Sequence, residues 1–382
     1  MQGKFLSRTM RRHVSGACQA VTLNAFLIST IILLFTSGAF AQAPPITFAE
    51  FQAPDAGTKT GQGTLALSIN SLGDVAGYYY DSKGVAHGFV RDTSGTITEF
   101  DAPGAGTAAG QGTFGGQINT SGEIAGNFTD GNGVHHGYIR TAAGLVSAFD
   151  DPNAGTASGQ GTQCCGLNTG GTAGGYYIDS SNVRHGYVRS TAGSFTNYDI
   201  AGSGTGTNQG TEGLSINDSG TVAGPFVDSN GVFHSYIRTS TGTVTTFDVP
   251  GAGTASGQGT AGLMINNTGT VVGSYFDSEG LSHGFQRSSA GTITTFNVSG
   301  ALLTAGVGIS NSGWICGYYA DSRGVIHGYV RSPTGAIITF SAPGAGTLPG
   351  TGTFAWEINN TPTVVGYYIT SGGVYGGYTV GK

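Results

Sequence analysis

The chain has 382 residues, of which 70 are glycine and only 9% are charged. A glycine-rich, weakly charged composition is compatible with disorder, but aromatic and β-branched residues recur here at regular spacing, which disordered chains lack. The formal net charge of −6 argues against nucleic acid as a partner, because contacts with phosphates require a basic surface.

The N-terminus has the pattern of a secretory signal peptide. A basic segment with Lys4, Arg8, Arg11 and Arg12 comes first, an apolar run follows at residues 25–35, and a small-residue cleavage motif ends at Ala41. The apolar run is too short to predict a transmembrane span, although a retained N-terminal anchor is the alternative. We therefore expect residues 1–41 to be removed, and the mature protein to be secreted or extracellular, or periplasmic. Removal leaves 11 basic against 21 acidic residues, a net charge of −10.

A unit of about 49 residues repeats through the rest of the chain. Its clearest marker is an Ile-Asn pair or a close variant, which recurs at steps of 49, 49, 49, 49, 44 and 49 residues: Ile69-Asn70, Ile118-Asn119, Leu167-Asn168, Ile216-Asn217, Ile265-Asn266, Ile309-Ser310 and Ile358-Asn359. The single short step arises between Phe296 and Ser310. The chain thus contains seven units, and the fifth-to-sixth connection is shortened.

Each unit contains four short stretches rich in β-branched or aromatic residues, in the first unit residues 64–70, 74–80, 85–91 and 96–100. Short turns with glycine separate them, and a longer glycine-rich segment, residues 102–112, leads to the next unit. A repeated four-stranded meander is typical of a propeller blade. The sequence therefore predicts an all-β, seven-bladed β-propeller with four antiparallel strands per blade.

The two chain ends predict how the ring closes. The last unit stops before its fourth strand, and residues 46–51 match that missing strand. We expect this N-terminal strand to complete the C-terminal blade, so that no sheet edge stays open. Residues 42–382 would then form a single propeller domain, which we expect to be monomeric.

Three cysteines follow residue 41, namely Cys164, Cys165 and Cys316. An odd number in an exported protein does not predict a disulfide framework. Cys316 also lies three units beyond the adjacent pair, too far for a bridge of normal geometry. We expect small buried residues, with a disulfide between Cys164 and Cys165 as the alternative.

The unit resembles the bacterial HAF family of probable extracellular repeats. The stretches that carry the resemblance are His87-Gly-Phe-Val-Arg91, His136-Gly-Tyr-Ile-Arg140, His185-Gly-Tyr-Val-Arg189 and His327-Gly-Tyr-Val-Arg331. Departures are Ser235 in the fourth unit, Gln286 in the fifth, and the loss of both His and Arg in the seventh. The resemblance implies an exported repeat protein without an assigned activity, and it supplies no catalytic residues.

A histidine recurs in six units, and an arginine follows four positions later in each. On a strand these residues share a face, and one interpretation is a ring of cationic sites. The alternative, which we favour, is a structural network in which each histidine is buried and bonded to a turn aspartate such as Asp81 or to an inner-strand threonine. The six are His87, His136, His185, His234, His283 and His327.

A glutamine occupies equivalent places in five of the long connections: Gln62, Gln111, Gln160, Gln209 and Gln258. Loops on a rigid scaffold often carry binding residues, so these glutamines are our candidates for ligand binding, on the face that carries the long loops. Their alternative role is to tie each loop to its neighbour. The Asp-x-x-Gly turns offer one carboxylate each, fewer than a calcium loop needs. We therefore expect no metal and no cofactor.

Unique residues that break the repeat are where an enzyme on this scaffold would place its chemistry. They include Glu212, Glu357, Asp151, Trp314, Trp356 and the Cys164 pair. Glu212 and Glu357 fall on predicted inner strands, so a hydrolase or lyase with paired carboxylates is one hypothesis. The repeated loops favour a non-catalytic module that binds a glycan or an extracellular protein. A purely structural surface protein is the third possibility.

Overall fold

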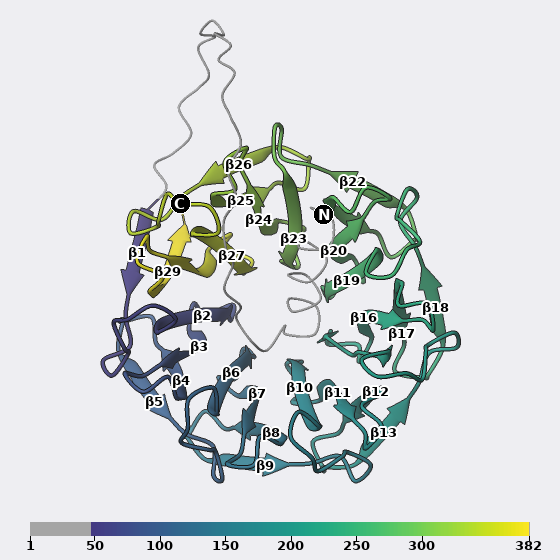
Figure 1. Cartoon of the computed structure of the whole chain (residues 1–382), viewed down its shortest axis with the longest axis horizontal. Helices are drawn as coiled ribbons and strands as arrows, with labels where there is room; N and C mark the ends of the chain where they lie inside the picture. The colour runs from purple at the N-terminus through teal and green to yellow at the C-terminus, as the bar shows by residue number, and fades with distance from the viewer. Residues whose placement is uncertain (1–46, 382) are drawn as a thin grey trace, which may run out of the picture.

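The computed structural model describes residues 47–381, so the predicted signal peptide lies outside the described residues. Within this range every regular element is a β-strand, which confirms the all-β prediction. The strands form a ring around a central axis (Figure 1). The same range contains no helix of a length and hydropathy that would cross a membrane.

The strands follow one another as antiparallel neighbours in consecutive groups, one for each repeat of the sequence. The first three groups contain β2 (Gly63–Ile69), β3 (Val75–Tyr80), β4 (Ala86–Arg91) and β5 (Ile97–Phe100); β6 (Gly112–Ile118), β7 (Ile124–Thr129), β8 (His135–Arg140) and β9 (Val146–Phe149); and β10 (Gly161–Leu167), β11 (Ala173–Ile178), β12 (Arg184–Arg189) and β13 (Phe195–Tyr198).

The next groups contain β14 (Gly210–Thr211), β15 (Ser215–Ile216), β16 (Val222–Val227), β17 (Phe233–Arg238) and β18 (Val244–Phe247); β19 (Gly259–Ile265), β20 (Val271–Phe276), β21 (Ser282–Arg287) and β22 (Ile293–Phe296); β23 (Leu303–Ile309), β24 (Ile315–Ala320), β25 (Ile326–Arg331) and β26 (Ile337–Phe340); and β27 (Gly352–Ile358), β28 (Val364–Ile369) and β29 (Tyr375–Gly381). In Figure 1 the first strand of a group lies nearest the axis and the last lies at the periphery.

The N-terminal strand completes the last group, as predicted. β1 (Thr47–Phe51) pairs antiparallel with β29, in a register that runs from Thr47 opposite Gly381 to Phe51 opposite Gly377. Two ends of the chain more than 300 residues apart in sequence are therefore joined by a backbone ladder, which covers the edge that β29 would otherwise expose.

The inner strand of the fourth repeat is interrupted, which the repeat pattern does not predict. β14 ends at Thr211 and β15 begins at Ser215. The facing strand carries Pro225, which has no N–H group to donate to the carbonyl of Glu212. That carbonyl accepts the hydroxyl of Tyr236 at 3.0 Å.

Antiparallel meanders place their connections at two opposite ends of the ring. One end, here called the turn face, carries residues 70–74 and 92–96 and their equivalents. The other, the loop face, carries residues 81–85 and the long connections between groups. A glycine opens the inner strand of every group except the sixth, where β23 begins at Leu303. The preceding group comes very close at these glycines: a Cβ on Gly112 would lie 2.1 Å from the carbonyl oxygen of Ala86, at a φ of +112°.

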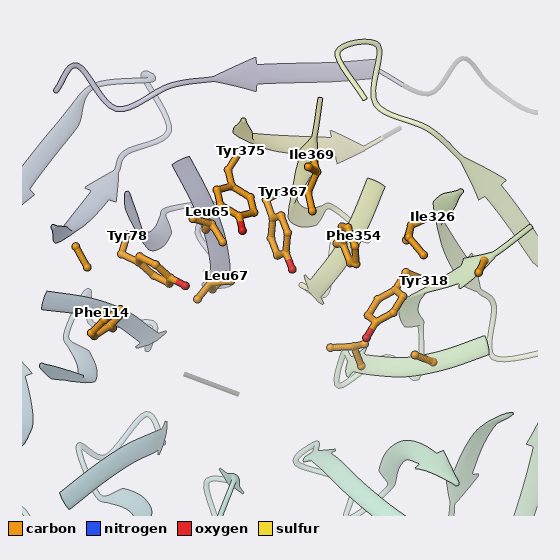
Figure 2. Close-up of a cluster of buried hydrophobic side chains, with 14 residues drawn as sticks. Leu65, Leu67, Tyr78, Phe114, Tyr318, Ile326, Phe354, Tyr367, Ile369 and Tyr375 are labelled. Atoms are coloured by element: carbon orange, nitrogen blue, oxygen red, sulfur yellow. The ribbon is translucent and has the colours of Figure 1, made fainter. Parts of the chain in front are cut away.

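The core lies in the seams, meaning the contacts between the inner strand of one group and the preceding group. In the largest cluster Tyr78 packs on Phe114 at 5.3 Å and Tyr318 on Phe354 at 5.1 Å between ring centroids. Figure 2 shows the hydroxyl ends of Tyr78, Tyr318 and Tyr367 pointing inward. Aromatic pairs of this kind join neighbouring groups through large buried apolar areas.

Candidate functional site

The six repeated histidines are half-buried and bonded within their own repeats. The Nδ1 atom of His87 lies 3.0 Å from Asp101, and the ring stacks on Tyr79 at 5.1 Å. The equivalent partners of Nδ1 in the other five repeats are Asp150, Asp199, Asp248, Asn297 and Ser341. The side chains of these histidines retain 20 to 27% exposure, so the rings are mostly buried but not fully enclosed.

The partners differ in part from those predicted. The turn aspartate faces Nε2, at distances from 2.8 Å for Asp277 to 3.8 Å for Asp81. The inner-strand threonine does not bond the ring in the first repeat, since Thr64 Oγ1 accepts the N–H of Ala53. The main partner, Asp101, was missed although it belongs to the repeated motif. It follows β5, whose pairing with β4 sets Phe100 opposite Gly88.

The carboxylates that flank these rings favour the imidazolium form. Hydrogen bonding to Asp101 raises the pKa of His87, and Asp199 and Asp248 raise the pKa of His185 and of His234 in the same way. In these three repeats the charge of the imidazolium is thus matched by acidic groups of the same repeat.

The arginine four positions after each histidine binds an aromatic ring of the preceding repeat. The guanidinium carbon of Arg91 lies 4.9 Å from the centroid of Phe51, and that of Arg189 lies 4.4 Å from Phe149. The same contact recurs for Arg140, Arg238, Arg287 and Arg331. Cation–π contacts of this kind join adjacent groups, so the arginines are not a ring of open cationic sites.

The five candidate glutamines use their amide groups inside the loop face. Gln62 Oε1 accepts the N–H of Lys59 at 3.0 Å, and its Nε2 donates to the carbonyl of Ser82 at 2.9 Å. Equivalent bonds are made by Gln111, Gln160, Gln209 and Gln258. This arrangement favours their tying role. A ligand site made by these glutamines stays a hypothesis.

The two unique glutamates bind different partners. Glu212 is fully buried, and its Oε1 lies 2.8 Å from Nη1 of Arg184 across the third-to-fourth seam. Glu357 Oε2 accepts the N–H of Ile69 at 3.1 Å across the seam that closes the ring. Burial raises the pKa of each carboxyl to about 7. Glu357 is among the residues that line the axial cavity described below, whereas Glu212 is not, so the two carboxylates do not face one common site where they could act as an acid and base pair.

Arg184 and His135 are functional candidates that sequence reasoning missed. Both occupy the position of Ala86 in the first repeat, and the next seam has Phe233 there, so the aligned repeats would have revealed them. His135 Nδ1 lies 3.1 Å from Thr129 Oγ1, and burial lowers its pKa to about 4. The third-to-fourth seam thus holds an ion pair where the following seam packs Phe233 with Ala261.

The other unique residues make contacts in the interior of the protein. Asp151 is buried and accepts Asn197 Nδ2 at 3.1 Å, and Trp356 packs near Tyr367 at 6.1 Å between centroids. Trp314 packs against the cluster that contains Phe340. The thiols Cys164, Cys165 and Cys316 are buried and not bridged, as expected, so the vicinal disulfide is absent from the described residues.

A cavity of about 160 Å³ lies on the axis at the turn face. Its wall is a ring of asparagines at the ends of the inner strands, each donating through Nδ2 to the backbone carbonyl of the next repeat. Asn217 Nδ2 lies 3.1 Å from the carbonyl of Asn266. The other donors are Asn70, Asn119, Asn168, Asn266 and Asn359, and Ser310 replaces the asparagine in the sixth repeat.

The rim of the cavity carries exposed hydroxyl, amide and carboxylate groups. Asp218 Oδ1 accepts the N–H of Thr169 at 2.9 Å, and its Oδ2 accepts Asn267 Nδ2 at 2.6 Å. Ser71 and Thr120 bond to each other at 3.1 Å on the rim of the first two repeats.

Deeper in the cavity, one position of the inner strand varies around the ring. It holds Gln117, Ser215, Met264 and Glu357 among the lining residues. Unlike the asparagine ring, these side chains do not repeat, and they give the cavity a distinct chemistry on each side. Residues 47–381 contain no cluster of three or more His, Cys, Asp or Glu suited to a metal ion.

Comparison with solved structures supports the fold. A streptogramin B lyase structure has a TM-score of 0.55 at 14% identity, with 88% of this chain and 98% of that chain covered. The BP39L lectin from Burkholderia pseudomallei has a TM-score of 0.54 at 10% identity, over 82% and 94%. A puromycin hydrolase has a TM-score of 0.50 at 12% identity, over 84% and 50%. Neither a scan against protein-family models nor a search of curated proteins finds a match.

The ring of radial antiparallel groups, together with these likenesses, shows that the chain folds as a β-propeller (Figure 1). At 10 to 14% identity the likenesses concern the fold alone. Propellers carry both binding and catalytic functions, so function has to be argued from the site.

Proposed function

We propose that the protein is an exported, seven-bladed propeller of four strands per blade that binds a glycan without chemical change. The grouping of strands by sequence repeat supports the blade count, with β1 as the outermost strand of the last blade. Export after cleavage near Ala41 and kinship with the HAF repeats remain part of this proposal, on the sequence patterns described above.

The axial cavity is the observation that carries the binding proposal. Its lining combines amides and hydroxyls with aliphatic residues of the inner strands such as Ile69, and its acid groups are Asp218 and Glu357. Sugars present many hydroxyl groups that both donate and accept hydrogen bonds, and amide side chains do the same. A polar, concave site at the axis that contains two acid groups and no basic group therefore suits a sugar residue better than an anion or an apolar ligand.

Elsewhere in the ring the repeated polar side chains already have partners within the protein, which also favours the axial cavity as the binding site. The repeated histidines, arginines and loop glutamines all have partners within the ring, as shown for His87, Arg91 and Gln62. Gln117, by contrast, is half-buried in the wall of the axial cavity and belongs to no repeated hydrogen-bond pattern.

A glycan array screened with residues 42–382 tests the proposal, followed by calorimetry on the best hit. Gln117→Leu, which keeps the side-chain volume but removes the amide, should weaken binding at least tenfold. Gln258→Leu on the loop face is the matched control and should leave binding unchanged. The reverse result would move the site to the loop face, and no binding to any glycan would leave a protein partner or a structural role.

A proton-transfer enzyme is the second candidate function, on one specific observation. Glu357 faces the cavity with a pKa of about 7, near the value that suits a general acid or base at neutral pH. A lyase or hydrolase would lose turnover in Glu357→Gln while retaining ligand affinity. A non-catalytic module would convert none of the glycans that it binds.

A further inference from the structure

A backbone N–H group on the axial wall distinguishes one side of the cavity. In the first, second and fifth repeats, the residue before the ring asparagine donates its N–H to a side chain of the preceding repeat. Ile118 N lies 3.0 Å from Ser68 Oγ, and Ile265 N lies 3.2 Å from Ser215 Oγ. Glu357 Oε2 takes this role for Ile69.

The N–H of Ile309 has the same orientation but faces a different side chain. Ile309 pairs with Ile315 in the register by which Ile69 pairs with Val75, so its N–H also points away from its own second strand. The residue in the place of Ser68 is Met264, whose thioether is only a weak acceptor. No oxygen at this position can therefore cap the donor.

Met264 adds an apolar surface next to that donor. It is half-buried, lines the axial cavity and packs against the cluster that contains Ile309 and Ile315. Methionine adapts its shape to small apolar groups. One side of the cavity thus combines an N–H donor with an apolar contact, whereas Gln117 and Glu357 contribute an amide and a carboxyl group to the lining.

The equivalent N–H of Leu167 faces the polar side chain of Gln117, and the two sites that face a glycine are crowded. A Cβ on Gly166 would lie 3.1 Å from the nitrogen of Ile216, and a Cβ on Gly308 would lie 2.9 Å from the carbonyl oxygen of Trp356. The inner strands of adjacent repeats therefore come close at both glycine sites. The Met264 side of the cavity is therefore the more accessible one.

We propose that the axial cavity recognises the acetamido group of an N-acetylated sugar, whose carbonyl oxygen accepts the N–H of Ile309 while its methyl group packs on Met264. This inference rests on the proposed glycan binding and names the class of glycan. The acetamido group is neutral, carries an acceptor beside a methyl group, and so matches both features of this wall. A hydroxyl group at the same place can accept the N–H but offers no methyl group to Met264, and a charged amine offers neither an acceptor nor a methyl group.

Three disaccharides with the same linkage test the proposal by calorimetry. N,N′-diacetylchitobiose carries acetamido groups, chitobiose carries amines and cellobiose carries hydroxyls. We expect the acetylated sugar to bind at least tenfold more tightly than the other two. Equal binding of all three would overturn the acetamido proposal while leaving glycan binding intact, whereas no glycan binding in the array would overturn the proposed function itself.

Variants at Met264 separate the two contacts. Met264→Ser copies Ser215, should cap the N–H of Ile309, and should abolish the preference for the acetylated sugar. Met264→Leu keeps an apolar side chain without an acceptor and should preserve it within about threefold. Thermal melting of both variants checks that the ring stays folded. A Ser variant that folds and still discriminates tenfold would show that the donor is not used.

Discussion

Asn217 allows the contribution of the asparagine ring to stability to be tested. Its side chain is 5% exposed and donates to the carbonyl of Asn266 across a seam. Its Oδ1 also accepts the N–H groups of Ser219 and Thr221 at 3.1 and 3.0 Å, and the hydroxyl of Ser219 at 2.7 Å. Asn217→Ala therefore removes one bond between repeats and three within the turn. At about 1 kcal/mol for each net hydrogen bond, we expect a loss of roughly 3 to 4 kcal/mol.

The sixth repeat provides the matched control. Ser310 stands in the place of the asparagine, and its Oγ still accepts the N–H of Trp314 at 3.1 Å, but it has no amide with which to reach Asn359. Asn217→Ser should keep part of the turn bonding and lose the bond across the seam, at a total cost smaller than that of alanine. Ser310→Asn should add the missing bond and raise stability by about 1 kcal/mol.

Urea unfolding of residues 42–382 and of the three variants measures these differences, with the slope of the free energy against urea compared as a check on the unfolded state. The expected order of stability is Ser310→Asn, the unmodified protein, Asn217→Ser and Asn217→Ala. An equal cost for the serine and alanine variants, together with no gain from Ser310→Asn, would show that the asparagine ring does not hold the seams together.

Three further predictions concern other contacts. His234 has a pKa raised by Asp248, so its contribution to stability is full below the unfolded pKa and is lost as pH rises through the folded one; His234→Gln should therefore cost more at pH 5 than at pH 8.5 in urea unfolding, and an equal cost would refute the pairing. Glu212→Ala alone leaves Arg184 without its partner and should destabilise by roughly 3 to 5 kcal/mol, whereas Glu212→Ala with Arg184→Phe, which copies the next seam, should recover most of the loss. Deleting residues 46–51 should expose the edge of β29 and produce aggregation in light scattering, and truncation at Gln42 should not.

The fold was predictable because each turn of the repeat carries its own signal. Asn70 Oδ1 accepts the N–H groups of Leu72, Gly73 and Asp74, and Gly73 adopts a φ of +100°. The chemistry of the Asn-x-x-Gly turn thus fixes where one strand ends and the next begins. The interruption between β14 and β15 was not predicted, because it depends on Pro225 in the facing strand.

The site was less predictable, because it depends on contacts between repeats. The sequence spacing indicates that His87 and the turn residue Asp81 share a repeat, but the closer partner Asp101 follows only from the pairing of β4 with β5. The glutamines were proposed as ligand contacts from their place in the loops. Their bonds to the 81–85 turns could not be read from the sequence, since those turns are distant along the chain.

Breaks in the repeat have two physical consequences in this ring. Where the repeat is intact, its polar groups satisfy one another, as His87 and Gln62 do, and little remains for a ligand to bind. Where a substitution in one repeat removes a donor or an acceptor, its hydrogen-bond partner in the neighbouring repeat loses that bond. Ser310 leaves the carbonyl of Asn359 without its usual donor at a seam, and Met264 leaves the N–H of Ile309 without a capping side chain in a cavity. The first change weakens the scaffold, whereas the second lies where a ligand can supply the missing acceptor. Binding on this propeller should therefore follow the places where its symmetry fails at the axis.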